Sequence, residues 1–149
     1  MNMSYVLKSG IAFFMLLTGT LLYLMFRSDN LLVFSWIDSL ELTSSINALR
    51  NVSANIKLGD FYTMCLPDGL YVASYMLFMD TIWKDSDFAK EYIMLSLPIF
   101  CILSEFGQLI ELVPGTFDIY DIICYVIPIL IYELSIYGKF YKTRILSDL

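Results

Sequence analysis

The sequence predicts an all-α integral membrane protein, a four-transmembrane-helix bundle that forms a single membrane domain over residues 1–149. Hydrophobic residues make up 58% of the chain and charged residues only 16%, whereas about a quarter of the residues in soluble domains are charged. The mean hydropathy is +0.70. The apolar residues also gather in runs that turn or charged segments separate, as expected of helices in lipid.

Residues 6–26 form the clearest apolar run, and they are long enough to cross a bilayer, which needs about 20 residues. Lys8 stands near its beginning and Arg27 closes it. A cleaved signal peptide is the competing interpretation, but the run is long and lacks an A-x-A cleavage site. We therefore expect a retained first span.

The connection over residues 28–65 begins with Ser28-Asp29-Asn30, which favours helix capping. Its apolar segment Leu31 to Ile37 is too short to span a membrane and contains Trp36. We expect an interfacial helix here that is anchored by Trp36, with a short strand or a lid as the alternative. The part from Leu42 to Lys57 is polar and is expected to lie in water.

Three further spans are expected over residues 67–84, 92–112 and 119–137. Pro67-Asp68-Gly69 favours a turn at the beginning of the first of them, and Trp83 marks its interfacial end. Pro114-Gly115 separates the other two. Because residues 67–84 and 92–112 include acids, a three-span protein is the alternative.

The distribution of Lys and Arg predicts the orientation, because cytoplasmic segments carry the excess of these residues. With four spans, one side holds six of them: Lys8, Lys84, Lys90, Lys139, Lys142 and Arg144. The other side holds three: Arg27, Arg50 and Lys57. We therefore expect a multi-pass protein of the bacterial inner membrane with both termini in the cytoplasm. The cytoplasmic docking surface is expected to comprise Lys84, Lys90, Lys139, Lys142 and Arg144.

Polar residues gather toward the outward end of the expected span 92–112. At about 100° per residue, Ser104, Gln108 and Glu111 share one helical face, with Glu105 beside it. Ionisable groups at membrane depth are costly, and they normally face a cavity or a partner. We expect Glu105 and Gln108 to bind a ligand or to form hydrogen bonds between helices, within one chain or between subunits.

Three aspartates begin the neighbouring spans at the same outward end. Asp118 and Asp121 are one turn apart at the beginning of the last span, where the helix dipole favours carboxylates, and Asp68 has the equivalent position in the second. These acids have no basic partner there. Ligand binding is one interpretation, while helix capping and solvation at the interface are equally good for Asp118 and Asp121.

Asp80 stands apart, near the cytoplasmic end of the second span. It is about 100° away from the face of Asp68, Tyr71 and Tyr75. We expect its side chain to extend toward Lys84 at the membrane surface.

Glu105-x-x-Gln108, then Pro114-Gly115, then Asp118 and Asp121 resembles the VanZ-like family of small bacterial membrane proteins. That family is associated with tolerance to glycopeptides and other envelope-active agents. Its pattern has an acid and an amide late in one span, a Pro-Gly-Arg turn, then an Asp with an Asn one turn on. The resemblance implies Glu105, Gln108 and Asp121 as the matching positions.

This chain departs from the VanZ-like pattern at two positions. Thr116 replaces the arginine and Tyr125 stands in place of the asparagine. Arginine commonly binds phosphate through two parallel hydrogen bonds. The missing arginine therefore puts in doubt a shared binding of anionic head groups.

Several classes of function are disfavoured by composition. The net charge of −6 disfavours nucleic-acid binding. Histidine is absent, and the three cysteines include no C-x-x-C pair, so the sequence predicts neither a metal site nor a cofactor. An enzyme is disfavoured because no nucleophile–base pair or phosphate loop stands out.

We therefore expect a non-enzymatic membrane subunit that forms a homo-oligomer, senses or shields an envelope component and recruits a cytoplasmic protein partner. Envelope stress and phage defence are processes that use subunits of this form, by analogy alone. One alternative is a VanZ-like factor that binds an envelope lipid or a glycopeptide. The other is a small oligomeric ion channel lined by Glu105 and Gln108.

Overall fold

The computed structural model describes residues 3–29 and 31–147, without the side chains of 3–4, 87–91 and 136–147. These residues form helices and connections, with no strand among them. The elements are α1 (Met3–Phe26), α2 (Leu32–Ser39), α3 (Thr43–Ser53), the π-helical turn η1 (Phe61–Cys65), α4 (Leu66–Ile82), α5 (Asp87–Leu109) and α6 (Ile119–Ser147). The predicted all-helical class is confirmed.

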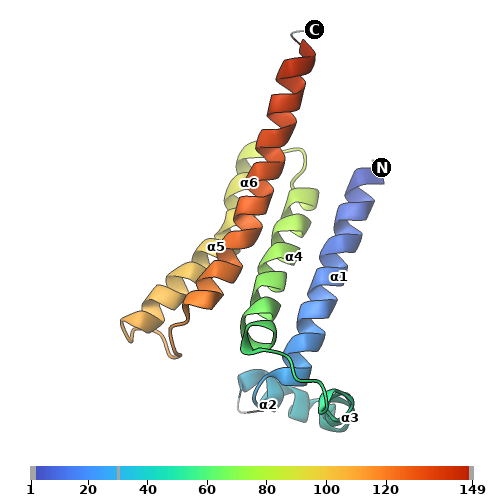
Figure 1. Ribbon diagram of the computed structural model, residues 1–149, viewed down its shortest axis with the longest axis vertical. Coiled ribbons are helices and arrows are strands. Elements are labelled where there is room, and N and C mark those ends of the chain that lie inside the picture. Colours follow the sequence, from blue (N-terminus) through green and yellow to red (C-terminus); the bar gives the residue numbers. More distant parts are fainter. Residues whose placement is uncertain (1–2, 30, 148–149) are drawn as a thin grey trace.

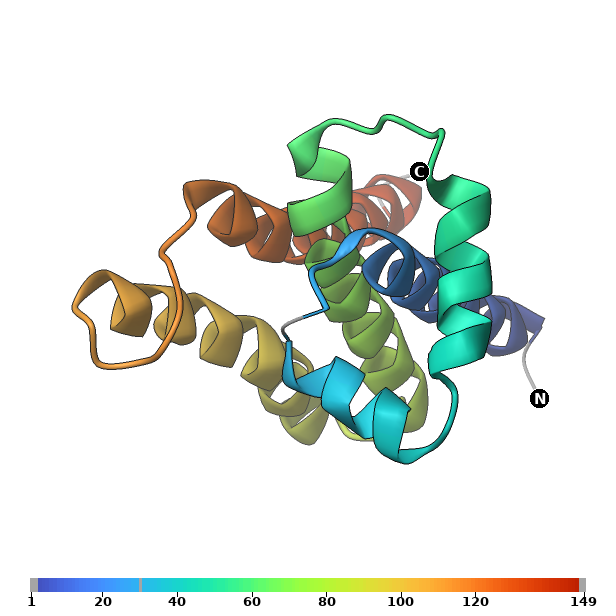
Figure 2. The same ribbon diagram turned by 90° about the horizontal axis from the view of Figure 1, so that it is seen from below.

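The four long helices α1, α4, α5 and α6 run alternately up and down (Figure 1). The beginning of α1 and the end of α6 therefore lie at one end of the bundle, which we call the terminal end. Seen from the opposite end, α2 and α3 lie on the side of α1, and α5 projects away from α1 (Figure 2). The sequence predicted that the two termini share one side of a membrane, and this stays a prediction.

The core is built around α4, which packs against α1, α5 and α6. Its buried side chains Val72 and Met76 contact Met94 of α5 and Tyr125 of α6. Near the other end of α4, a Cβ atom on Gly69 would lie 3.1 Å from both Cβ and the carbonyl oxygen of Cys124. Glycine is needed here because only its missing side chain lets α4 and α6 approach so closely.

Two helices of the described residues are long and apolar enough to cross a membrane, over Tyr5–Phe26 and Tyr92–Leu109. Large apolar side chains are exposed along both of them, including Phe14 and Phe100. Exposed apolar side chains also follow α6, including Leu130 and Leu134. By length and composition, the other two expected spans do not meet the same test.

The prediction that a helix continues to residue 112 is wrong, because α5 ends at Leu109. Glu111 has a φ of +57°, and its N–H donates to the Gln108 carbonyl oxygen at 3.1 Å. The Leu112 N–H donates to the Gly107 carbonyl oxygen at 2.8 Å. These bonds form a Schellman motif, whose left-handed position glycine usually occupies. With a glutamate there, the sequence lacked the usual signal for the helix end.

Candidate functional site

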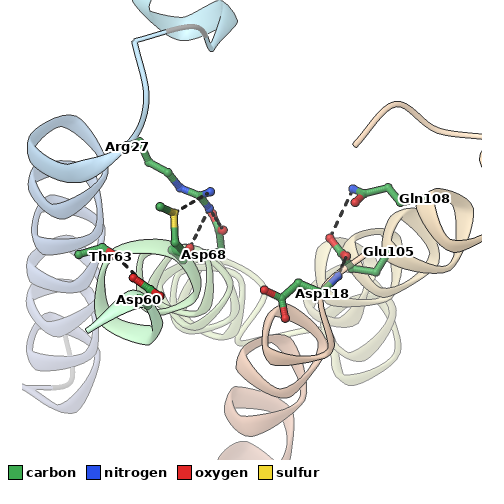
Figure 3. A network of polar contacts seen from close by, with 8 residues as sticks. Arg27, Asp60, Thr63, Asp68, Glu105, Gln108 and Asp118 are labelled. Atoms are coloured by element: carbon green, nitrogen blue, oxygen red, sulfur yellow. Dashed lines mark hydrogen bonds and ion pairs between the residues drawn. The ribbon is translucent and has the colours of Figure 1, made fainter. Parts of the chain in front are cut away.

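Six polar residues lie at the end of the bundle opposite the termini, and we call them the polar cluster. They lie at the end of α1, the beginning of α4, the end of α5 and the beginning of α6: Arg27, Asp68, Glu105, Gln108, Asp118 and Asp121. Figure 3 shows Arg27 and Asp68 on one side, Glu105 and Gln108 on the other, and Asp118 between them. The cluster thus contains four carboxylates and one guanidinium group.

Arg27 supplies the positive charge that the sequence analysis did not expect at this end. Its Nη2 lies 2.7 Å from Asp68 Oδ2, and the same nitrogen donates to the Met64 carbonyl oxygen at 2.7 Å. The guanidinium also lies over the ring of Tyr23. The expectation that these acids have no basic partner is therefore wrong for Asp68. The pair is 41 residues apart in sequence, so no local pattern indicated it.

Glu105 is the most deeply buried member of the cluster, with 4% of its surface exposed. Its Oε2 accepts a hydrogen bond from the Asp118 backbone N–H at 3.2 Å, which connects α5 to the beginning of α6. Gln108 Nε2 donates to Glu105 Oε1 at a long 3.5 Å. Glu105 and Gln108 therefore take part in contacts within the chain, one of the outcomes expected for them.

Asp118 caps α6, since its Oδ1 accepts the Tyr120 N–H at 2.8 Å. This is the capping role that was one alternative for it. Asp121 lies in the first turn of α6. Its Oδ1 is buried and accepts no hydrogen bond from the residues whose side chains are described.

Cys65 lies beside the polar cluster, and its thiol is hydrogen-bonded to the Asp121 carboxylate. The ligand atoms of Cys65, Asp118 and Asp121 all lie within 4.8 Å of one another, so one cation could contact all three. Burial raises the pKa of the Cys65 thiol to about 12, and Asp121 adds to the shift through its hydrogen bond and its negative charge. The group is therefore a neutral thiol near neutral pH.

Glu111 lies outside the cluster. Because α5 ends before it, the expected helical face of Ser104, Gln108 and Glu111 does not exist, and the Glu111 side chain is exposed. Tyr71 and Tyr75 also point elsewhere. The Tyr71 hydroxyl donates to Thr20 Oγ1 on α1, and the Tyr75 hydroxyl donates to the Ile93 carbonyl oxygen on α5.

The terminal end holds a second polar group, around Asp80. Its side chain is buried, with 1% of the residue exposed, so the expected extension toward Lys84 is wrong. Asp80 pairs with Lys8 of α1 and accepts a hydrogen bond from the Tyr132 hydroxyl of α6 at 2.8 Å. Lys84 instead lies over the ring of Tyr5.

The expected surface residues are only partly described. Trp36 and Trp83 are both exposed. Of the expected docking surface, the side chain of Lys84 is described and exposed, whereas those of Lys90, Lys139, Lys142 and Arg144 lie outside the described residues.

Comparison with protein-family models, curated proteins and solved structures found no match.

Proposed function

We propose that this chain is a four-span, non-enzymatic protein of the bacterial inner membrane that binds an amine-bearing head group of an envelope component through the polar cluster. Both termini face the cytoplasm in this proposal, and the polar cluster faces outward. The observation that carries it is the presence of four carboxylates and one arginine at one end of the bundle. Their excess of negative charge favours a cationic or zwitterionic ligand.

Four spans are supported by the lengths of α4 and α6, by the pairing of a buried acid and by exposed apolar side chains. Helix α4 is 17 residues long and α6 is 29 residues long, so both reach the lower limit of about 17 residues for a membrane span. The buried Asp80 is paired with Lys8, which lowers its cost in a membrane. The exposed apolar side chains of α1, α5 and α6 suit lipid, because soluble proteins rarely expose such continuous surfaces.

A binding role is favoured over catalysis by the chemistry of the cluster. Cys65, beside the cluster, is a potential nucleophile, but a thiol with a pKa of about 12 is almost wholly protonated at neutral pH. The chain has no histidine that could serve as its base. The carboxylates can instead accept hydrogen bonds from an ammonium group, which are stronger than those between neutral groups.

Recruitment of a cytoplasmic partner is supported by the length of α6. The helix continues to Ser147, ten residues past the expected end of its span, and it extends beyond the other helices at the terminal end (Figure 1). The basic residues Lys139, Lys142 and Arg144 belong to this part of the sequence. Envelope stress and phage defence are the processes that we propose for this recruitment, by analogy with other small membrane subunits.

The binding proposal is tested by native mass spectrometry of the purified protein with phosphatidylethanolamine or phosphatidylglycerol as the probe. We expect preferential retention of phosphatidylethanolamine, and about tenfold weaker retention by Glu105→Gln, since a hydrogen bond to a charged group contributes about 1.5–3 kcal/mol. Glu111→Gln is the matched control, because Glu111 lies at the same end but outside the cluster. Equal retention by the two variants, or of the two lipids, would contradict the proposal.

A further inference from the structure

The segment between α1 and α4 contains two short helices, α2 and α3, which meet at an angle (Figure 2) and which Arg50 connects to the end of α1. Arg50 Nε donates to the Leu24 carbonyl oxygen at 2.8 Å, and Nη2 donates to the Arg27 carbonyl oxygen at 2.6 Å. Arg50 also pairs with Asp29 and lies over the ring of Phe34 of α2. One guanidinium thus satisfies carbonyl groups at the end of α1, where a helix has no partners of its own for them.

Both α2 and α3 carry an exposed apolar stripe. On α2 the stripe consists of Leu32 and Trp36, and Leu40 continues it directly after the helix. These three residues are spaced by four, and Trp36 is 60% exposed. On α3 and the turn after it the stripe is Leu49, Val52 and Ile56, and Val52 is 75% exposed. Residues spaced by three and four lie on one side of a helix. No residue of α2 is buried, so the bundle leaves this apolar surface uncovered.

The other side of α3 is polar. At about 100° per residue, Thr43, Ser44, Asn47 and Asn51 lie on the side away from the apolar stripe. Helix α3 is therefore amphipathic, although the polar character of Leu42 to Lys57 predicted that this segment lies in water. A helix with separate apolar and polar sides is suited to the boundary between lipid head groups and acyl chains.

We propose that α2 and α3 lie together in the interfacial layer of the membrane, with both apolar stripes inserted among the lipids. This inference rests on the membrane placement in the proposed function. The Arg50–Leu24 hydrogen bond sets α3 against the last turn of the apolar run Tyr5–Phe26, and so at the depth where a span would leave the bilayer. Continuity with that apolar surface identifies lipid as the partner.

The charge of the segment that contains α2 and α3 favours insertion into the membrane through apolar contact alone. Residues 28–57 contain the acids Asp29, Asp38 and Glu41 against the bases Arg50 and Lys57. Binding through basic residues would require anionic lipids, whereas apolar burial does not. We therefore expect α2 and α3 to insert into bilayers of phosphatidylcholine, which have no net charge.

Tryptophan fluorescence in phosphatidylcholine vesicles tests the inference. In a Trp83→Phe background, Trp36 is the remaining tryptophan. We expect its emission to be quenched by lipids brominated near the head group and shielded from aqueous acrylamide. Full access to acrylamide with no quenching by brominated lipid would overturn the inference, as would shielding that appears only as the protein-to-lipid ratio rises, which would indicate a second copy.

Two adjacent positions of α3 give a matched pair. In a background with both native tryptophans replaced by Phe, we expect Val52→Trp to be quenched by brominated lipid at least about twofold more than Asn51→Trp, because the two side chains point to different sides of the helix. Equal quenching would overturn the placement of α3.

Phe100→Trp in the same background separates this inference from the membrane placement. Phe100 is exposed on α5, within the apolar run Tyr92–Leu109. We expect lipids brominated deep in the acyl chain to quench it. If it is quenched while Trp36 and Val52→Trp are not, only the inference that α2 and α3 insert into the membrane is wrong. If none of the three is quenched, the membrane placement fails as well.

Discussion

The carboxylates at the two ends of the bundle differ in burial and in the charged groups that contact them. At the terminal end, Asp80 is almost wholly buried, and groups from two other helices, Lys8 of α1 and Tyr132 of α6, contact it. At the other end, Arg27 pairs with Asp68, and each of these side chains is about one-fifth exposed. The polar cluster contains three further carboxylates, those of Glu105, Asp118 and Asp121.

This difference separates a structural role from a binding role. A buried carboxylate must have its charge balanced, because a single removed partner leaves a costly group in the interior. The Asp80 group meets that condition and joins three helices. The polar cluster holds more negative charge than Arg27 balances, and one oxygen of Asp121 accepts no hydrogen bond from the described side chains. Excess charge of this kind is expected where a ligand binds.

The largest effect on stability is expected from Lys8→Met. The substitution removes the ammonium group that pairs with a carboxylate 1% exposed, and we expect it to lower the free energy of unfolding by about 3 kcal/mol. Reversible unfolding in mixed micelles measures it. The double variant Lys8→Met/Asp80→Leu should be more stable than Lys8→Met, because it removes the buried charge as well. A double variant no more stable than Lys8→Met would show that the pair does not hold the terminal end together.

A smaller loss is expected from Gly69→Val, which tests packing beside the polar cluster. Its side chain would meet Cys124 at 3.1 Å and force α4 and α6 apart, at a cost of about 2 kcal/mol. Gly10→Val is the matched control at the terminal end, because no atom lies within 4 Å of a Cβ there. The same unfolding measurement should show little loss for the control. Similar losses for both variants would indicate that helix propensity, not the close contact, sets the cost.

Asp121→Asn should make Cys65 more reactive, by about tenfold, because it removes a negative charge that raises the thiol pKa. Alkylation at pH 8 of a variant with Cys101 and Cys124 replaced by Ser measures the rate. Burial is the larger cause of the raised pKa and stays in place. The rate should therefore remain below that of a cysteine placed at the exposed Ser39. An unchanged rate would show that Asp121 does not contact the thiol.

Local patterns in the sequence predicted the helices better than the pairing between them. The apolar runs indicated the four long helices, and the position of Glu105, Asp68 and Asp118 at helix ends indicated that they gather at one end of the bundle. That prediction needed only the alternating direction of successive helices. The end of α5 was missed because Glu111, and not a glycine, has the left-handed conformation that stops the helix.

The ion pairs could not be read from local sequence. Lys8 and Asp80 are 72 residues apart, and Arg27 and Asp68 are 41 apart. Their partners are set by which helices pack side by side, and the sequence offers Lys84 as a nearer partner for Asp80. The proposed binding role of the polar cluster depends on such contacts as well, since Arg27 was expected to do no more than close the first span.

The smallest effect is expected from the ion pair of the polar cluster. In a double-mutant cycle of Arg27→Met and Asp68→Leu, we expect a coupling energy of about 0.5–1 kcal/mol, because water screens a pair that is partly exposed on both sides. The same cycle at Lys8 and Asp80 should give a several-fold larger coupling, since Asp80 is buried. Both cycles use one protein, one micelle and one unfolding measurement. Equal couplings would mean that the polar cluster is as much a structural joint as the terminal end, and its surplus of carboxylates would then no longer favour a ligand.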